Sequence, residues 1–203
     1  CVDLHQTVND DQSTGVHSIE CDVIVNASGA WVNDIIARCG RTKQLTIETI
    51  QGTHIVLEKP ISDTCFYLEA QDGRVVFVLP WHGKTLVGTT ETPFAGKPED
   101  TTPLASEIEY LLTTVQRYFP TADTRIADSF SGLRVLPAST TKAFARSRDT
   151  QYLDDDGLIT IYGGKLTAYR ATAETVMRYV KKYTRTTKAI ANTRHLPLEL
   201  PPE

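Results

Sequence analysis

Hydrophobic positions between residues 44 and 90 come in short runs, rich in β-branched and aromatic residues, that are separated by turn residues. This pattern is typical of antiparallel β-strands. Connections this short exclude parallel crossovers, which need about a dozen or more residues. We expect turns at Gln51-Gly52, Asp72-Gly73 and His82-Gly83. The expected strands are Leu45–Ile50, His54–Leu57, Phe66–Leu68, Val75–Leu79 and Thr85–Val87.

In three other segments, apolar residues recur with the period of an α-helix. The first begins at Trp31 and stops at Gly40. The second has Thr102 as its N-cap and ends at Pro120, and the third begins at about Lys165. Helices and antiparallel strands together predict an α+β fold.

The remaining apolar runs predict further strands. The first 20 residues fit a hairpin, and Cys21–Asn26 fits a short buried strand. Because Ala27–Ala30 and then a helix follow that strand, the arrangement is typical of a nucleotide-binding crossing. Other strand-like segments are Ile126–Val135, Ala143–Arg148 and Leu158–Ile161.

Composition narrows the class of protein. The chain has 203 residues, of which 40% are hydrophobic and 23% charged, so it can bury one large core or two small ones. A net charge of −4 gives no reason to expect nucleic acid as a partner, and no apolar run approaches the ~20 residues that span a bilayer. The four cysteines form no CxxC pair, so we expect no metal site and a reducing cytoplasm. The chain opens at Cys1 without a methionine, and we interpret it as a piece of a longer protein.

The stretch YGGKLTAYR, residues 162–170, joins an apolar run directly to a helical pattern. Gly163 and Gly164 permit positive φ and close approach of a ligand, and a helix N-terminus favours an anion. Lys165 in the first turn is unfavourable for the helix dipole, which indicates a second anion nearby. An ordinary strand-to-helix turn is an equally good interpretation.

Three cations could converge on one anion. Arg134 lies in the apolar segment SGLRVLP, where a buried arginine needs a partner. Arg146 and Arg148 alternate, so both face one side of a strand. Arg134, Arg148 and Lys165 together would suit a phosphate or a carboxylate. A structural ion pair for Arg134 and solvated arginines on an edge strand are the alternatives.

His54 begins the run HIVL and is a candidate general base, although a lone histidine beside a strand is more often structural. The chain contains no GxGxxG, Walker, HExxH or GxSxG motif. The residues by themselves therefore support an anion-binding pocket on an α+β scaffold and do not define a reaction.

Seven motifs in order nevertheless resemble the FAD-dependent, quinone-linked glycerol-3-phosphate dehydrogenases, over about residues 20–180. Family members often have proline where Val135 stands and aspartate where Glu91 stands. The motifs are VNASGAWV, QGTHIVL, VVFVLPW, LVGTTE, SGLRVLP, ARSRD and YGGKLTAYR.

The resemblance implies a D-amino-acid-oxidase-like architecture in which the GxGxxG segment precedes this chain. It divides the chain into the end of the first FAD-binding portion (1–43), an antiparallel-sheet substrate domain (44–140), a returning FAD-binding segment (141–182) and a tail or linker (183–203). Without the GxGxxG segment, we expect the isolated chain to bind FAD weakly and to be inactive.

The resemblance also implies roles for individual residues. His54 and Arg134 are the catalytic candidates, with His54 removing the proton from the C2 hydroxyl of glycerol 3-phosphate. Arg134, Arg148 and Lys165 are the candidates for binding the substrate. The candidates for binding FAD are Ala27, Ser28, Gly29, Gly163, Gly164, Lys165, Leu166 and Thr167.

Hydride transfer to FAD would give dihydroxyacetone phosphate, with electrons passed to quinone, or to oxygen in an oxidase relative. The parent protein is expected to be dimeric and cytoplasmic, peripheral on the inner face of the cytoplasmic membrane. Two alternatives stay open. One is a related FAD-dependent amino-acid or hydroxy-acid oxidase, in which a single arginine can hold a carboxylate. The other is a non-catalytic module that binds an anion.

Overall fold

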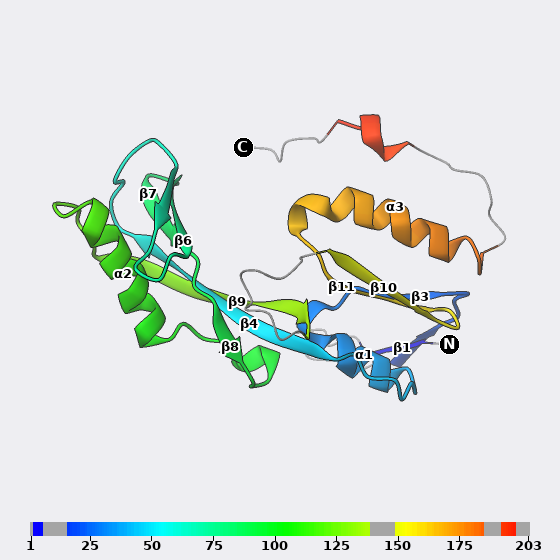
Figure 1. Ribbon diagram of the computed structural model, residues 1–203. Coiled ribbons are helices and arrows are strands. Elements are labelled where there is room, and N and C mark those ends of the chain that lie inside the picture. The colour runs from blue at the N-terminus through cyan, green and yellow to red at the C-terminus, as the bar shows by residue number, and fades with distance from the viewer. Residues whose placement is uncertain (1, 6–15, 139–148, 185–191, 198–203) are drawn as a thin grey trace. The chain divides into compact units, whose positions relative to one another are not determined.

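The computed structural model describes residues 2–5, 16–138, 149–184 and 192–197. The chain forms two compact units (Figure 1). Unit 1 combines Cys1–Ala27 with Asp149–Glu203, and unit 2 is Ser28–Arg148. The four-part division expected from the resemblance stays a prediction.

Unit 2 is built on an antiparallel sheet with strand order β5-β6-β7-β4-β8, in which β9 also pairs with β4. The helix α2 lies beside this sheet, and α1 follows a single 3₁₀ turn at Gly29–Trp31 (Figure 1). The elements are β4 (Ile47–Leu57), β5 (Phe66–Glu69), β6 (Val75–Trp81), β7 (Lys84–Gly88), β8 (Thr92–Phe94), β9 (Ile126–Pro137), α1 (Val32–Arg38), α2 (Ala105–Tyr118) and a 3₁₀ turn at Pro98–Asp100.

The predicted turn at Gln51-Gly52 is wrong, because β4 runs through it as one strand of 11 residues. Gln51 is buried and donates hydrogen bonds to the carbonyl of Thr102 and the carboxylate of Glu107. Gly52 leaves space that a side chain would fill, since an added Cβ would lie 2.7 Å from the Arg134 guanidinium. The other two predicted turns are confirmed at Gly73 and Gly83, which both have positive φ.

The helix α2 begins at Ala105 with Leu104 as its N-cap, so the predicted cap at Thr102 is wrong. The Leu104 amide instead donates to Oε2 of Glu107, at 3.2 Å, in the first turn of the helix. The Glu107 carboxylate thus accepts a hydrogen bond from the Leu104 amide, which has no acceptor within the helix. The hydroxyl of Thr102 is not needed for this purpose. The predicted end of the helix before Pro120 is confirmed.

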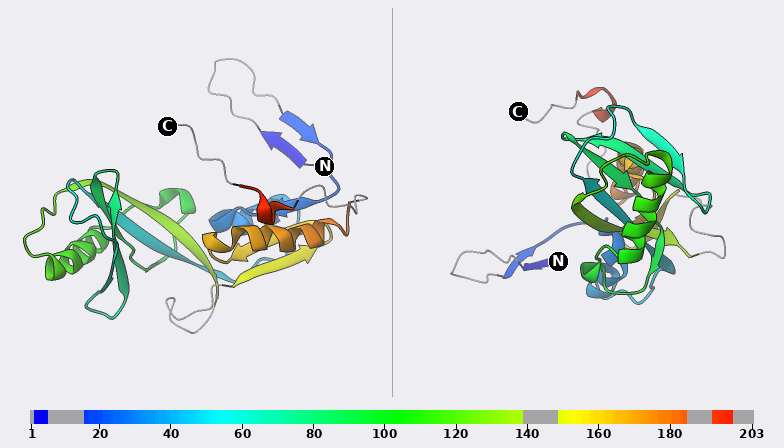
Figure 2. Two further views of the ribbon diagram at one scale, coloured as in Figure 1. Left: turned by 90° about the horizontal axis from the view of Figure 1, so that it is seen from above. Right: turned by 90° about the vertical axis from the view of Figure 1, so that its left-hand side faces the viewer.

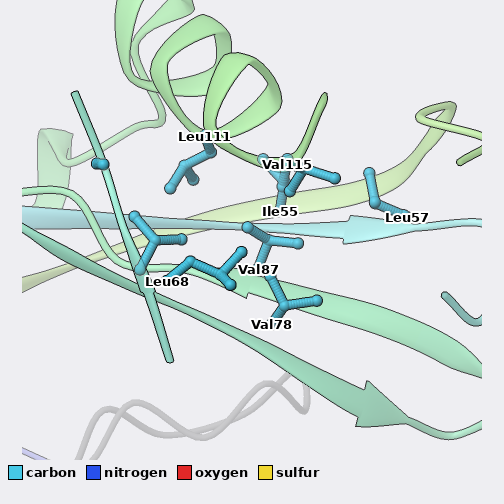
Figure 3. Close-up of a cluster of buried hydrophobic side chains, with 9 residues drawn as sticks. Ile55, Leu57, Leu68, Val78, Val87, Leu111 and Val115 are labelled. Carbon is cyan, nitrogen blue, oxygen red and sulfur yellow. The ribbon is translucent and has the colours of Figure 1, made fainter. Parts of the chain in front are cut away.

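The core of unit 2 lies between α2 and one face of the sheet (Figure 3). Leu111 and Val115 of the helix are fully buried against Ile55, Leu57 and Val87 of the strands. Burying side chains of this size contributes about 1.5–3 kcal/mol each. The packing fixes which face of the sheet α2 covers.

Unit 1 contains a three-stranded sheet in which β10 pairs antiparallel with β11, and β11 pairs parallel with β3. The helix α3 packs on β10 and β11 (Figure 2). The elements are β3 (Ile24–Asn26), β10 (Thr150–Asp155), β11 (Leu158–Gly163), a 3₁₀ turn at Leu166–Ala168, α3 (Tyr169–Val180), the hairpin of β1 (Val2–His5) with β2 (Val16–Ile19), and a 3₁₀ turn at Thr193–His195.

These mixed sheets with helices confirm the predicted α+β class. Two strands, β8 and β10, were not predicted. The predicted strand at Ala143–Arg148 lies outside the described residues. None of the helices in the described ranges is both long and apolar enough to cross a membrane.

Candidate functional site

The strand β4 carries the candidate site of unit 2 on the face that α2 does not cover. Its residues 51, 53, 55 and 57 point toward the helix side, where they contact Glu107 or the apolar core. Because successive strand residues point to opposite faces, Gly52 and His54 belong to the other face. We call this second surface the open face.

The side chain of His54 lies over Gly88 of the neighbouring strand β7, on the open face. Its imidazole stacks on the Phe130 ring, with 5.1 Å between centroids and 10° between planes. Gly88 stands opposite His54 in the ladder, and a Cβ there would lie only 2.1 Å from the imidazole Cδ2. The glycine is therefore what allows the ring to occupy this position.

Partial burial lowers the pKa of His54 from its ordinary value of 6.5, and the positive charge of Arg134 lowers it further. The imidazole is therefore neutral at neutral pH. A neutral imidazole can accept a proton, as a general base must.

Arg134 of β9 extends over Gly52 toward the segment that follows β7. It donates from Nη2 to Oγ1 of Thr89 (3.1 Å) and from Nη1 to the carbonyl of Thr90 (3.3 Å). It also pairs with the Glu91 carboxylate at 3.4 Å. The ion pair with a carboxylate is the structural alternative that the sequence left open for this arginine, and the guanidinium is held beside His54 by three consecutive residues.

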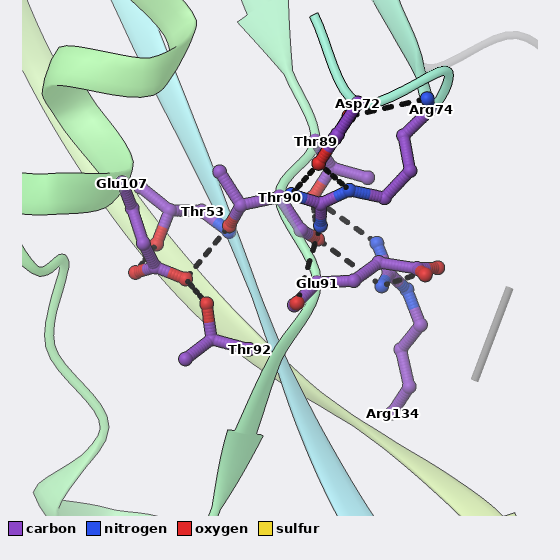
Figure 4. Close-up of polar contacts among 9 residues, drawn as sticks. All are labelled: Thr53, Asp72, Arg74, Thr89, Thr90, Glu91, Thr92, Glu107 and Arg134. Carbon is purple, nitrogen blue, oxygen red and sulfur yellow. Dashed lines mark hydrogen bonds and ion pairs between the residues drawn. The ribbon is translucent and has the colours of Figure 1, made fainter. Parts of the chain in front are cut away.

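Behind the open face, four side chains donate hydrogen bonds to the buried Glu107 carboxylate, and Figure 4 shows three of them, Thr53, Thr90 and Thr92. Glu107 is 3% exposed. Burial by itself would raise its pKa, but hydrogen bonds from the surrounding side chains outweigh this and lower it, so the group stays ionised. The donors are Gln51 Nε2 (2.7 Å), Thr53 Oγ1 (2.5 Å), Thr90 Oγ1 (2.8 Å) and Thr92 Oγ1 (2.7 Å).

This network joins the two chain segments that carry the open-face groups. Thr53 stands between Gly52 and His54, and its amide donates to the Thr90 hydroxyl at 2.8 Å. Thr90 in turn offers its carbonyl to Arg134. The buried carboxylate therefore fixes the strands on which His54 and Arg134 depend.

A pocket of about 360 Å³ opens on the same face beside Arg134. Its lining combines two cations, one carboxylate, a hydroxyl and two aromatic rings. These belong to Arg74, Arg134, Glu91, Thr89, Tyr67 and Phe77.

In unit 1, two of the candidate FAD-binding segments end side by side. The strands β3 and β11 are parallel, with Asn26 opposite Thr160, so Ala27 and Gly163 follow at the same edge of the sheet. Ligands of α/β sheets bind at the carboxyl ends of parallel strands. Ser28 and Gly29 come next in the chain and begin unit 2.

The turn at Gly163-Gly164 has the backbone that a closely approached ligand requires. Both glycines have positive φ, 70° and 79°, and a Cβ on Gly164 would lie 2.5 Å from Oγ1 of Thr150. Lys165 and Leu166 are exposed just before α3 begins. A glycine turn, a helix N-terminus and a parallel strand edge are features that suit the binding of FAD.

The structure thus brings His54 together with Arg134 in unit 2, and Ala27 together with Gly163–Thr167 in unit 1. Arg148 lies outside the described residues. Within the described ranges, no group of three His, Cys, Asp or Glu side chains is placed to hold a metal ion.

Sequence reasoning missed Glu107 and Arg74. A readable signal existed for Glu107, which interrupts the apolar stripe of its helix between Leu104 and Leu111. No such signal marks Arg74, which lies next to a predicted turn.

A family model described as FAD dependent oxidoreductase (DAO) matches residues 2–175. The chain is 35% identical over 173 residues to the D-erythritol 1-phosphate dehydrogenase of Brucella abortus, covering 78% of this chain and 34% of that protein. It is 30% identical over 185 residues to the aerobic glycerol-3-phosphate dehydrogenase of Staphylococcus saprophyticus, covering 86% and 33%.

Among solved structures, the glycerol-3-phosphate dehydrogenase from Bacillus halodurans complexed with FAD aligns with a TM-score of 0.71 at 26% identity. That alignment covers 93% of this chain and 40% of the solved one. The chain spans about a third of the length of the curated relatives it matches. A family match over nearly the whole sequence, on a fold that places a glycine turn at a parallel strand edge, shows that the chain belongs to the FAD-dependent oxidoreductases of the DAO family.

Proposed function

We propose that the protein oxidises sn-glycerol 3-phosphate to dihydroxyacetone phosphate, using FAD, and passes the electrons to quinone. The observation that carries the proposal is the pair formed by His54 and Arg134 on the open face, a neutral base held beside a cation. Two of the compared proteins are named glycerol-3-phosphate dehydrogenases, which supports this choice of substrate.

In this proposal His54 accepts the proton of the C2 hydroxyl while the hydrogen on C2 leaves as hydride, so the carbon becomes a ketone. FAD supplies the chemistry of hydride acceptance. Arg134, Arg148 and Lys165 bind the substrate, and Arg148 and Lys165 offset its phosphate charge. The desolvation that lowers the pKa of His54 keeps it ready to receive the proton at neutral pH.

Ala27, Ser28 and Gly29, together with residues 163–167, are the proposed contacts to FAD. The glycines let backbone approach the cofactor closely, and the helix N-terminus behind them favours negative charge on it. Their role is to hold the cofactor and to make its reduction more favourable.

The decisive experiment uses the full-length protein. Its visible spectrum should show bound flavin, which glycerol 3-phosphate should bleach under anaerobic conditions. Arg148→Ala and Lys165→Ala should then raise KM, whereas Lys181→Ala, on the exposed end of α3, should not. A protein that cannot be loaded with FAD would overturn the proposal. Bleaching only by an amino or hydroxy acid would assign the protein to the oxidases.

A second candidate substrate is D-erythritol 1-phosphate. The chain is 35% identical to a protein named for this reaction. The chemistry at C2 and the roles of His54 and Arg134 would be the same, and the two candidates differ only in the length of the polyol.

A further inference from the structure

The pocket beside Arg134 lies on the open face, on the far side of Gly88 from His54. In the ladder, Gly88 lies opposite His54 on one side and opposite Phe77 on the other. Thr89 comes next in the chain, and Phe77, Thr89 and Arg134 all line the pocket. A substrate whose reacting carbon lies at His54 therefore has this cavity within reach of its remaining carbons.

The charges in the pocket are balanced within the protein. Arg134 pairs with Glu91 at 3.4 Å, and Nη2 of Arg74 pairs with Asp72 at 2.7 Å. Arg74 also donates to the carbonyl of Glu91 and lies 4.8 Å from the centroid of the Tyr110 ring. A phosphate placed here would face the Glu91 carboxylate, so the site does not suit a dianion (Figure 4). Fixed donors beside a fixed acceptor suit hydroxyl groups, which can both donate and accept.

Two aromatic side chains form the apolar wall of the pocket. Tyr67 is 69% exposed and Phe77 is 45% exposed, and their rings meet edge to face with centroids 5.0 Å apart. Large aromatic groups left exposed beside polar ones indicate a ligand-binding surface. The C–H groups of a carbon chain can pack on such rings while its hydroxyls turn toward Glu91 and Thr89.

We propose that this pocket is a subsite for the hydroxyl-bearing carbons of a phosphorylated polyol longer than glycerol, with Glu91 and Tyr67 selecting for chain length. The proposal rests on the function proposed above. Its volume of about 360 Å³ lies within the range of roughly 300–1,000 Å³ found for small-molecule sites. Each added carbon on the side away from the phosphate brings one more hydroxyl for the pocket to bind.

The test measures kcat/KM of the full-length, FAD-loaded protein for a four-carbon polyol 1-phosphate and for glycerol 3-phosphate. The ratio of the two values, four-carbon over three-carbon, should exceed one. Glu91→Gln and Tyr67→Ala should each lower this ratio about tenfold, the effect of losing about 1.4 kcal/mol of selective binding. Trp81→Ala is the matched control, because Trp81 is 44% exposed on the same strand as Phe77 and does not line the pocket.

The outcomes separate the two proposals. If glycerol 3-phosphate reduces the flavin and the four-carbon substrate does not, the subsite is wrong and the proposed function stands. The subsite is also wrong if Glu91→Gln and Tyr67→Ala leave the ratio unchanged or move it no more than Trp81→Ala does. If neither phosphate reduces the flavin, the proposed function fails and the subsite fails with it.

Discussion

The two faces of the sheet in unit 2 differ in what surrounds their polar groups. On the face covered by α2, Glu107 is 3% exposed and accepts from four side chains and one amide. On the open face, His54 is only partly buried, and its neighbour Phe130 is 45% exposed. On the covered face the buried carboxylate is satisfied by hydrogen bonds within the protein. On the open face, the side chains around His54 remain partly exposed and can contact a ligand.

One strand of this sheet is thus held rigidly on one side and presents reactive groups on the other. Thr53 and His54 are adjacent in β4, yet one is locked to Glu107 and the other is available. Because strand residues alternate between faces, the covered face can hold the backbone while the open face presents side chains. Changes to the two faces should therefore affect different measurements.

The largest effect is expected from His54→Asn on the open face. Removing a general base typically lowers kcat by about 10²–10⁴-fold. The free energy of unfolding should change by only about 1 kcal/mol, the value of a lost ring stack. Steady-state kinetics and chemical denaturation of the same preparation would measure both. His82→Asn, at an exposed hairpin tip, is the control, and equal kcat in the two variants would refute the role of His54.

On the covered face, Glu107→Ala should lower the free energy of unfolding by at least about 3 kcal/mol. Several buried donors would lose their acceptor, each at a cost of about 1–3 kcal/mol. Glu109→Ala, exposed on the same helix, should change it by less than about 0.5 kcal/mol. Urea denaturation compares the two, and similar midpoints would show that the buried network does not stabilise the unit.

A smaller effect is expected from Gly88→Ala, which places a methyl group against the imidazole. Overpacking of this kind costs about 1–3 kcal/mol, and displacement of the ring should also lower kcat. Gly132→Ala on β9 is the matched control, since a Cβ there meets nothing within 4 Å. If both variants behave alike, the space over Gly88 is not what positions His54.

The smallest effect is a shift in pH dependence. Because burial and the charge of Arg134 lower the pKa of His54, the acidic limb of kcat/KM should lie below pH 6.5. Arg134→Gln removes a positive charge that disfavours the imidazolium, so the limb should move to higher pH, while Arg134→Lys should leave it nearly in place. A pH profile of each variant measures this. A limb that moves downward in Arg134→Gln would contradict the assigned cause.

Local patterns were enough to predict most strands, the end of α2 and two of the three turns in the sheet, because these depend on nearby residues. The continuity of β4 through Gly52 could not be predicted, since it depends on Arg134, which is far away in sequence. The strand β10 was missed for a similar reason. Its sequence, TQYLDD, is polar, and pairing with β11 determines its conformation.

In the candidate site too, residues within local motifs could be predicted, whereas contacts between distant segments could not. The resemblance supplied His54, Arg134 and the glycine turn, because these stand within short quoted motifs. Periodicity alone left each of them with a structural alternative. The hydrogen bonds that join Thr53 and Thr90 to Glu107 connect three separate segments, and no local pattern contains that information.

The parallel pairing of β3 with β11 has a consequence for the order of folding. All of unit 2 lies between these two strands in the sequence, so their pairing closes a very long loop, and the entropy of closure opposes it. Once unit 2 has folded, the segment between β3 and β11 has far less conformational entropy to lose when the two strands pair. We therefore expect the strand edge that ends at Gly163 to gain hydrogen-exchange protection only after the sheet of unit 2 has formed, and Glu107→Ala, although it changes only unit 2, to delay that protection during refolding.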